Sequence, residues 1–139
     1  MFSEANVYSS YSIDDAQKAR EFYGTTLGIN ISDTPGMEGS GMFNLLPAGG
    51  SRILLYERPS HQPPAYTVLN IVVENIDAAV DSLTDKGVGI LHYDGFNQDE
   101  KGVMRGLSVG QGPDIAWFND PAGNILSLQQ ETISPGNQP

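Results

Sequence analysis

The spacing of apolar residues near the start of the chain predicts a strand followed by a helix. Residues 6–13 form a strand-like segment, and Ser12 followed three residues later by Asp15 is a capping-box-like signal for a helix start. Gly28 supplies the left-handed residue that ends a helix. Between these signals, apolar residues recur at spacings of three and four along one stripe: Ala16, Ala19, Phe22, Tyr23 and Leu27.

The remainder of the first half predicts three more strands. Residues 29–32, 42–46 and 52–57 are apolar enough for strands, and the turn 47–51 separates the last two. The stretch 33–41 is rich in Gly, Pro and Ser and therefore predicts a loop. The first half is thus expected to form one strand-helix-strand-strand-strand unit.

The second half repeats this order of elements. Residues 66–73 predict a strand, Asn75 a helix cap, Gly87 the helix end and residues 88–92 the next strand. The apolar residues of the second helix are Ile76, Ala79, Val80 and Leu83. The same order of strand, helix, glycine stop and strand in both halves argues for duplication.

A short repeated motif gives an alignment of the two halves. The turn 121–123 repeats the Pro-Ala-Gly of 47–49 and pairs Phe43 with Trp117. The segments 53–55 and 125–127, which are 72 residues apart, are paired as well. Three prolines in 58–65 mark the junction between halves, because proline lacks an amide donor and interrupts helices and central strands. We therefore expect one domain at 1–139. It consists of module 1 (about 5–58), a junction (58–65), module 2 (about 66–131) and a loose tail (132–139).

Charge and composition narrow the functional classes. Seventeen acidic residues against seven basic ones give a formal charge of −10, and this field repels phosphate backbones, so no nucleic-acid partner is expected. The acidity either serves solubility or favours a positively charged small molecule. The absence of cysteine excludes disulfides, thiolate metal sites and cysteine nucleophiles. No apolar run suits a membrane span or signal peptide, so we expect a cytoplasmic protein without membrane contact.

Two motifs carry a resemblance to a known family. Residues 12–23, which end in Phe-Tyr, are followed by Leu27 and Gly28, and residues 117–129 contain Asp-Pro-Ala-Gly between two strands. This order resembles the vicinal oxygen chelate superfamily of glyoxalases, bleomycin-resistance proteins and dioxygenases over residues 5–131. The resemblance implies an α+β fold of two βαβββ modules whose curved mixed sheets enclose one cavity. It also implies a homodimer.

Metal-dependent members of that superfamily place four His, Gln or Glu ligands in the cavity. Carried over by position, the first ligand falls at Tyr8, the second at Leu69 or Val68, the third at Ser127 and the fourth at Leu54 or Leu55: none suits a divalent metal. His61 and His92 are expected on the surface or in loops. No cofactor is therefore expected, although a divalent metal at a non-standard site stays open.

The resemblance and the strand alternation together select a set of candidate ligand-binding residues. For Phe43 and Trp117 core packing is an equal alternative, and for Glu57 the alternative is a solvated acid beside Arg58. The long stretch 93–105 is expected to be a binding loop or lid. Either Arg105 and Lys101 contact an anionic group there, or Asp94, Asp99 and Glu100 contact a cation, so the loop leaves the sign of the ligand open. The full set is Tyr8, Ser10, Phe43, Leu55, Tyr56, Glu57, Leu69, Phe96, Arg105, Trp117, Ser127 and Gln129.

These residues predict a metal-independent protein, similar to the bleomycin-resistance proteins, that binds a small organic molecule, with antibiotic sequestration as one such role. The alternative is a lyase, isomerase or dioxygenase of the same fold with a non-standard site around Glu57, Gln129 and Tyr8. A third possibility is a vestigial cavity in a protein that binds a protein partner. No Gly-x-Ser-x-Gly elbow or phosphate loop supports another catalytic class.

Overall fold

The computed structural model describes residues 1–133, so most of the expected tail 132–139 lies outside the described residues. The chain divides into two compact units, Met1–Pro63 (unit 1) and Pro64–Pro139 (unit 2). This boundary falls in the proline-rich stretch 58–65. Each unit contains one mixed sheet and one main helix, which is the α+β organisation that the sequence predicts. Within residues 1–133, no helix is long and apolar enough to span a membrane.

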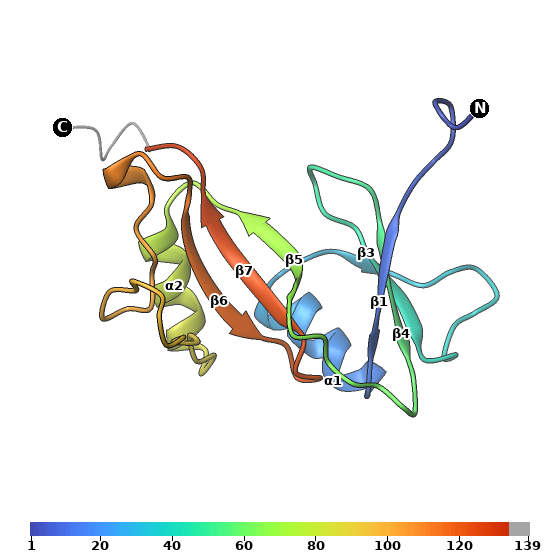
Figure 1. Ribbon diagram of the computed structural model, residues 1–139. Helices are drawn as coiled ribbons and strands as arrows, with labels where there is room; N and C mark the ends of the chain where they lie inside the picture. Colours follow the sequence, from blue (N-terminus) through green and yellow to red (C-terminus); the bar gives the residue numbers. More distant parts are fainter. Residues whose placement is uncertain (134–139) are drawn as a thin grey trace. The chain divides into compact units, whose positions relative to one another are not determined.

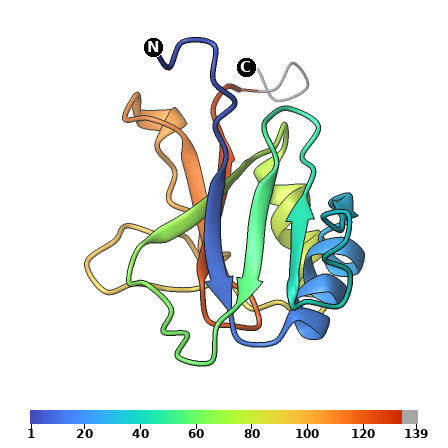
Figure 2. The same ribbon diagram turned by 90° about the vertical axis from the view of Figure 1, so that its right-hand side faces the viewer.

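Unit 1 contains a four-stranded sheet in the order β1-β4-β3-β2 (Figure 1). The strand β1 runs parallel to β4, and the other neighbours are antiparallel. Figure 2 shows β1, β4 and β3 side by side. The strands are β1 (Ser9–Ile13), β2 (Ile31–Ser32), β3 (Met42–Leu45) and β4 (Ile53–Glu57).

The helix of unit 1 begins and ends at the residues that the sequence predicts. The carboxylate of Asp15 accepts a hydrogen bond from the amide of Lys18 at 3.1 Å, which satisfies one free donor of the first turn. The helix comprises α1 (Ala16–Arg20) and the π-helical segment η1 (Glu21–Thr26). Gly28 then turns the chain with a φ of 73°, a left-handed conformation that favours glycine.

One face of the unit 1 sheet packs against this helix. Residues paired across neighbouring strands point to the same side, so two contacts with the helix identify that side. The hydroxyl of Tyr11 donates to that of Tyr23 at 2.8 Å, and the Arg20 guanidinium lies 4.9 Å from the centre of the Phe43 ring. We call this side the helix face and the opposite side the open face. The core of unit 1 consists of Ile13, Ala19, Phe22, Tyr23, Phe43, Leu45 and Leu55.

Unit 2 contains a three-stranded sheet in the order β5-β7-β6, with α2 along one side (Figure 1). The amide oxygen of Asn75 caps α2 by accepting from the amide of Ala78 at 3.0 Å. Its core includes Ile76, Val80, Leu83, Val103, Ala116, Phe118, Leu126 and Leu128. The elements are β5 (Thr67–Val72), α2 (Ile76–Asp85), the 3₁₀ turn η2 (Leu107–Val109), β6 (Asp114–Asn119) and β7 (Ile125–Gln130).

The strand predicted at 88–92 does not form. The free edge of β6 instead forms backbone hydrogen bonds with two different segments, one at Leu91 and one at Met104, so neither segment pairs with β6 as a continuous strand. Leu91 donates its amide to the carbonyl of Trp117 at 2.8 Å, and Met104 exchanges two backbone hydrogen bonds with Ile115 at 2.8 and 3.0 Å. The sheet of unit 2 therefore has three regular strands, and irregular segments take the place of a fourth strand beside β6.

Equivalent residues of the two units are 73 positions apart in the chain, whereas the predicted pairing of Phe43 with Trp117 assumes 74. In each unit, the last strand ends with a side chain that accepts a hydrogen bond from the first helical amide. The Glu57 carboxylate accepts from Ala16, and the Gln130 carbonyl accepts from Ile76, both at 2.9 Å. The equivalent positions are thus 73 apart (130 minus 57). A shift of one residue moves a strand side chain to the other face, so the predicted pairing is wrong.

Candidate ligand-binding surfaces

Four of the predicted ligand-binding residues lie on helix faces. Phe43 and Leu55 have no exposed surface and pack in the unit 1 core, which is the core-packing alternative for Phe43. Glu57 points to the same side and binds the amide of Ala16. Leu69 pairs with the fully buried Leu126 and therefore faces α2. The resemblance and the strand alternation that selected these residues do not fix the face on which each one lies, because a shift of one residue moves a strand side chain to the other face.

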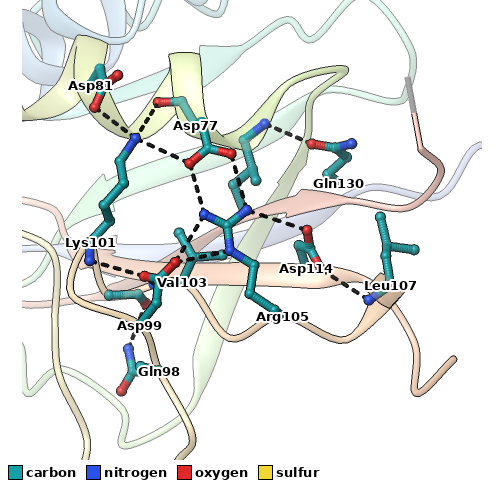
Figure 3. Close-up of polar contacts among 12 residues, drawn as sticks. Asp77, Asp81, Gln98, Asp99, Lys101, Val103, Arg105, Leu107, Asp114 and Gln130 are labelled. Carbon is teal, nitrogen blue, oxygen red and sulfur yellow. Dashed lines mark hydrogen bonds and ion pairs between the residues drawn. The ribbon is translucent and has the colours of Figure 1, made fainter. Parts of the chain in front are cut away.

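Arg105, the fifth, also lies on the helix side, inside an ionic cluster (Figure 3). Its guanidinium binds both carboxylate oxygens of Asp77 on α2, at 2.8 and 3.0 Å. It also lies 2.9 Å from Asp99 and 3.6 Å from Asp114. Lys101 extends the cluster by binding Asp77 at 3.1 Å, and it also binds Asp81 at 3.0 Å. The prediction that Arg105 faces a ligand therefore differs from the structure, in which three carboxylates surround it.

The cluster shifts the pKa values of its acids. The hydrogen bonds from Arg105 lower the pKa of Asp77 from 3.8 to about 2, and Lys101 adds to this effect against the opposing effect of burial. For Asp99, burial acts to raise the pKa, but the amide of Val103 and the guanidinium of Arg105 lower it overall. Their carboxylates thus stay ionised and hold the 93–105 loop against α2. Gln98 fixes the loop further by donating to the carbonyls of Leu91 and Gly102 at 2.8 and 2.7 Å.

The open face of unit 2 carries three aromatic rings. Trp117 on β6 contacts Tyr93 and Phe96 from the loop, with ring centres 5.7 and 5.4 Å away. Tyr93 and Phe96 contact each other at 5.5 Å. The rings are tilted or perpendicular, which is the favoured geometry for aromatic pairs. Phe96 is 50% exposed, so the aromatic cluster of Tyr93, Phe96 and Trp117 presents an apolar surface to solvent.

A polar network lies on the same open face. Asn70, Ser127 and Trp117 are opposite one another across β5, β7 and β6, so their side chains share a side. The side-chain carbonyl of Asn70 accepts from the Ser127 hydroxyl at 2.6 Å and from the Gln129 amide at 2.9 Å. Within the described residues, the side-chain NH2 group of Asn70 and the side-chain carbonyl of Gln129 make no hydrogen bond. They can therefore donate to and accept from a bound molecule.

The open face of unit 1 carries a different arrangement. The Arg52 guanidinium lies 3.4 Å from the centre of the Tyr8 ring, within the range of a cation–π contact. One of its nitrogens donates to the side-chain carbonyl of Asn44 at 3.0 Å. Ser10 pairs with Leu54, and Tyr56 lies two residues farther along β4, so both predicted residues lie on this side.

One histidine lies beside the open face of unit 1, because its hydrogen-bond partner Ser12 pairs with Tyr56 on that face. His61 makes a 2.6 Å hydrogen bond with the hydroxyl of Ser12, and His92 is exposed. Glu57 and Tyr8, which the enzyme alternative places in one site, lie on opposite faces of the unit 1 sheet. The described residues of unit 1 therefore do not bring these two groups together.

The residues present do not fit the metal site that the superfamily resemblance implies. Tyr8 lies against a guanidinium, whose positive charge opposes a metal cation at the same place. Ser127 is fully buried and donates its proton to Asn70, and Leu54 carries no donor atom. Across residues 1–133, no group of three or more His, Asp or Glu side chains could hold a metal ion.

Sequence reasoning missed four residues of the open faces: Asn44, Arg52, Asn70 and Tyr93. Arg52 precedes Leu54 by two residues, so strand alternation alone carries a signal for its side. Asn44 and Asn70 depend on strand register, and Tyr93 lies in a loop, so no local signal identifies them.

Two units of a mixed sheet with one helix, repeated in one chain, define the class of duplicated βαβββ folds. The chain belongs to the Glyoxalase/Bleomycin resistance protein/Dioxygenase superfamily, whose family pattern matches residues 8–128. No protein of curated function matches the chain.

Three solved structures illustrate this membership. A glyoxalase/dioxygenase from Nostoc punctiforme is 20% identical, with a TM-score of 0.67 and 94% of each chain covered. The antibiotic binding protein TnmS3 from Streptomyces sp. CB03234 is 24% identical, with a TM-score of 0.63 and coverage of 93% of this chain and 98% of that one. A glyoxalase/bleomycin resistance protein from the same organism is 26% identical, with a TM-score of 0.61 and coverage of 91% and 100%.

Proposed function

We propose that this protein binds a small organic molecule without a resident metal, and that the open face of unit 2 is a binding surface. The observation that carries the proposal is the aromatic cluster of Tyr93, Phe96 and Trp117 beside the Asn70–Ser127–Gln129 network. Ligand sites in proteins combine apolar and aromatic surface with a few fixed polar groups, which is the combination found here.

The chemistry of this face favours a planar ligand with polar substituents. Phe96 and Trp117 can stack against an aromatic ring. The amide group of Asn70 can donate to a carbonyl or hydroxyl of the ligand, while the Gln129 carbonyl can accept from it. The Ser127 hydroxyl and the Gln129 amide hold Asn70 in place, so little side-chain entropy is lost on binding.

Antibiotic sequestration is the finer form of the proposal. It is supported by the similarity to an antibiotic binding protein and by the formal charge of −10, which attracts cationic drugs. The proposal includes a homodimer, as the superfamily resemblance implies, and a location in the cytoplasm. Light scattering on the purified protein and fractionation of the producing cells test these two parts.

The test uses nuclear magnetic resonance, because Trp117 is the only tryptophan and gives one indole N–H signal. Titrations with 2-naphthol, 2-naphthylmethylamine and bleomycin cover neutral, cationic and antibiotic probes. We expect at least one probe to shift the indole signal saturably, with a dissociation constant below about 1 mM. Absence of a saturable shift for all three at millimolar concentration would contradict the proposal.

Two matched variants separate specific binding from adhesion to any exposed ring. Phe96→Ala removes a ring of the aromatic cluster and should weaken binding roughly fivefold, because a stacking contact contributes about 1 kcal/mol. Tyr66→Ala removes a 68% exposed ring elsewhere in unit 2 and should leave the affinity unchanged. Equal loss in both variants would indicate nonspecific contact.

A further inference from the structure

We propose that Arg52 forms a binding site for the carboxylate group of an organic molecule on the open face of unit 1. This inference deepens the proposed function and rests on it, because it names a chemical group that a bound molecule carries. The juxtaposition that supports it is a guanidinium that contacts an aromatic ring and a buried side-chain amide, and that forms no ion pair among residues 1–133.

The position of the guanidinium is fixed from two directions. Tyr8 lies 3.4 Å from it on one side, and Asn44 accepts from one of its nitrogens at 3.0 Å. Asn44 is only 5% exposed, and its own amide group donates to the Thr34 hydroxyl at 3.3 Å, so the acceptor is itself held. A guanidinium oriented in this way loses less side-chain entropy when it binds a planar anion.

The charge of Arg52 is not balanced by a neighbouring acid. Within the described residues, Arg20, Lys101 and Arg105 each form an ion pair with aspartate, whereas Arg52 forms none. Among the same residues Lys18 and Arg58 form none either, so the feature that sets Arg52 apart is that Tyr8 and Asn44 hold its guanidinium in place. A guanidinium has five N–H donors, and Arg52 uses one of them on Asn44. The remaining donors can bind both oxygens of a carboxylate.

The surroundings of Arg52 indicate what the rest of the ligand is like. Leu54 and Tyr56 follow it on the same face of β4, and both are half-buried, so they offer apolar surface beside the charge. Ser10 lies opposite Leu54 and adds a hydroxyl. The superfamily resemblance implies metal ligands at Tyr8 and at Leu54 or Leu55, and of the two leucines Leu54 lies on this face. Here the guanidinium supplies a positive charge in that region, which favours a carboxylate on an apolar or aromatic body.

The experiment compares 2-naphthoate with 2-naphthamide, which has nearly the same shape and no charge. Binding is followed by the Nε–H signal of Arg52 in nitrogen-15-labelled protein, assigned by its absence from the Arg52→Gln spectrum. We expect 2-naphthoate to bind roughly tenfold more tightly than 2-naphthamide and to shift the Arg52 signal. Addition of 0.5 M KCl should reduce this preference, because salt screens exposed charges.

Three variants locate the preference. Arg52→Gln should remove the preference for the carboxylate while leaving 2-naphthamide binding unchanged, and Arg52→Lys should restore part of it because it keeps the charge but not the planar donors. Arg58→Gln removes the same charge from an exposed residue just after β4 and serves as the control.

The outcomes are separable from those of the proposed function. If the amide and the carboxylate bind equally, or if Arg52→Gln keeps the carboxylate preference, the carboxylate site is wrong while small-molecule binding at Trp117 stands. If Arg58→Gln lowers the preference as much as Arg52→Gln does, the effect is general electrostatics and the site is wrong. If neither the Arg52 nor the Trp117 signal responds to any of the five probes, both proposals fail.

Discussion

In unit 1 the carboxylate of Glu57 binds the first amide of the helix, and in unit 2 the side chain of Gln130 does so in the same position. Both helices also begin with a side-chain cap, Asp15 in one unit and Asn75 in the other. In both units, therefore, the helix start is fixed by the same two contacts: a side-chain cap and a side chain at the end of the last strand. Their open faces have no such correspondence, because one carries a guanidinium on a tyrosine and the other an aromatic cluster.

This difference shows which face of a duplicated unit is free to change. A helix face is constrained by close packing, so each side chain must fit its neighbours. An open face has no partner layer within the unit, so its residues can change with little effect on stability. At equivalent positions 73 residues apart, Leu55 and Leu128 are both buried on helix faces, whereas Asn44 and Trp117 differ in chemistry on open faces.

The largest expected effect tests the assignment of faces directly. Leu55→Ala removes a fully buried side chain from the unit 1 core and should lower the free energy of unfolding by about 3 kcal/mol. Leu54→Ala removes the same atoms from a half-buried position on the open face and should cost about 1 kcal/mol or less. Urea denaturation followed by circular dichroism measures both. Equal costs would mean that the two faces are assigned incorrectly.

A smaller effect distinguishes the two helix caps formed by the last strands. The bond from Ile76 to Gln130 is buried, so Gln130→Ala leaves a buried amide without its acceptor and should cost about 2 kcal/mol. The bond from Ala16 to Glu57 is exposed, and water can replace the carboxylate in Glu57→Ala, so about 0.5 kcal/mol is expected.

The measurement is again urea denaturation, with hydrogen exchange of the Ile76 and Ala16 amides as a local readout. Gln130→Met keeps most of the side-chain volume without the acceptor oxygen, so it serves as the control that separates loss of the hydrogen bond from loss of packing. A cost for Glu57→Ala as large as that for Gln130→Ala would show that burial does not set the difference between the units.

Helix boundaries could be predicted from the sequence because their causes are local. Asp15 and Asn75 cap the amides three residues ahead of them, and Gly28 and Gly87 adopt φ values of 73° and 83° where the helices end. Each signal needs only a few neighbouring residues. Strand positions were predicted for similar reasons, apart from 88–92, where pairing with β6 is divided between Leu91 and Met104.

Side-chain directions could not be predicted from the repeated Pro-Ala-Gly motif. The motif lies between β3 and β4 in unit 1, where residues 46–52 form the connection, and between β6 and β7 in unit 2, where residues 120–124 do. Because the two connections differ in length, alignment on the motif displaces one strand against the other. The motif thus pairs Phe43, which lies on a helix face, with Trp117, which lies on an open face.

Long-range pairing explains the remaining differences. Arg105 is bound by Asp77, which is 28 residues earlier in the chain, and the Ser127 hydroxyl binds Asn70, which is 57 residues earlier. No local pattern connects these partners. The sequence could show that the 93–105 stretch has charged and aromatic residues, but only the folded chain separates them into the ionic cluster on the helix side and the rings on the open face.

The smallest expected effect concerns the ionic cluster, which has no counterpart of this size among the ion pairs described for unit 1. The pKa of Asp77 is about 2 in the folded protein against an ordinary 3.8, so its carboxylate stabilises the fold at pH values above about 4. This contribution is lost as the pH falls through about 2, because both states are then protonated. Asp77 is 45% exposed, so screening reduces the contribution to about 1 kcal/mol or less.

The variant Asp77→Asn should therefore be less stable than the parent protein at pH 7 by this amount, and the gap should close between pH 4 and pH 2. Urea denaturation at pH 7, 4, 3 and 2.5 measures the gap, with Asp94→Asn, an exposed acid in the same unit, as the control. A gap that stays constant down to pH 2.5 would show that Asp77 contributes through packing or amide hydrogen bonding. A closing gap would instead show that the charge pairing of Asp77 with Arg105 and Lys101 holds the loop, so that unit 2 depends on pH through a contact on its helix side, away from its open face.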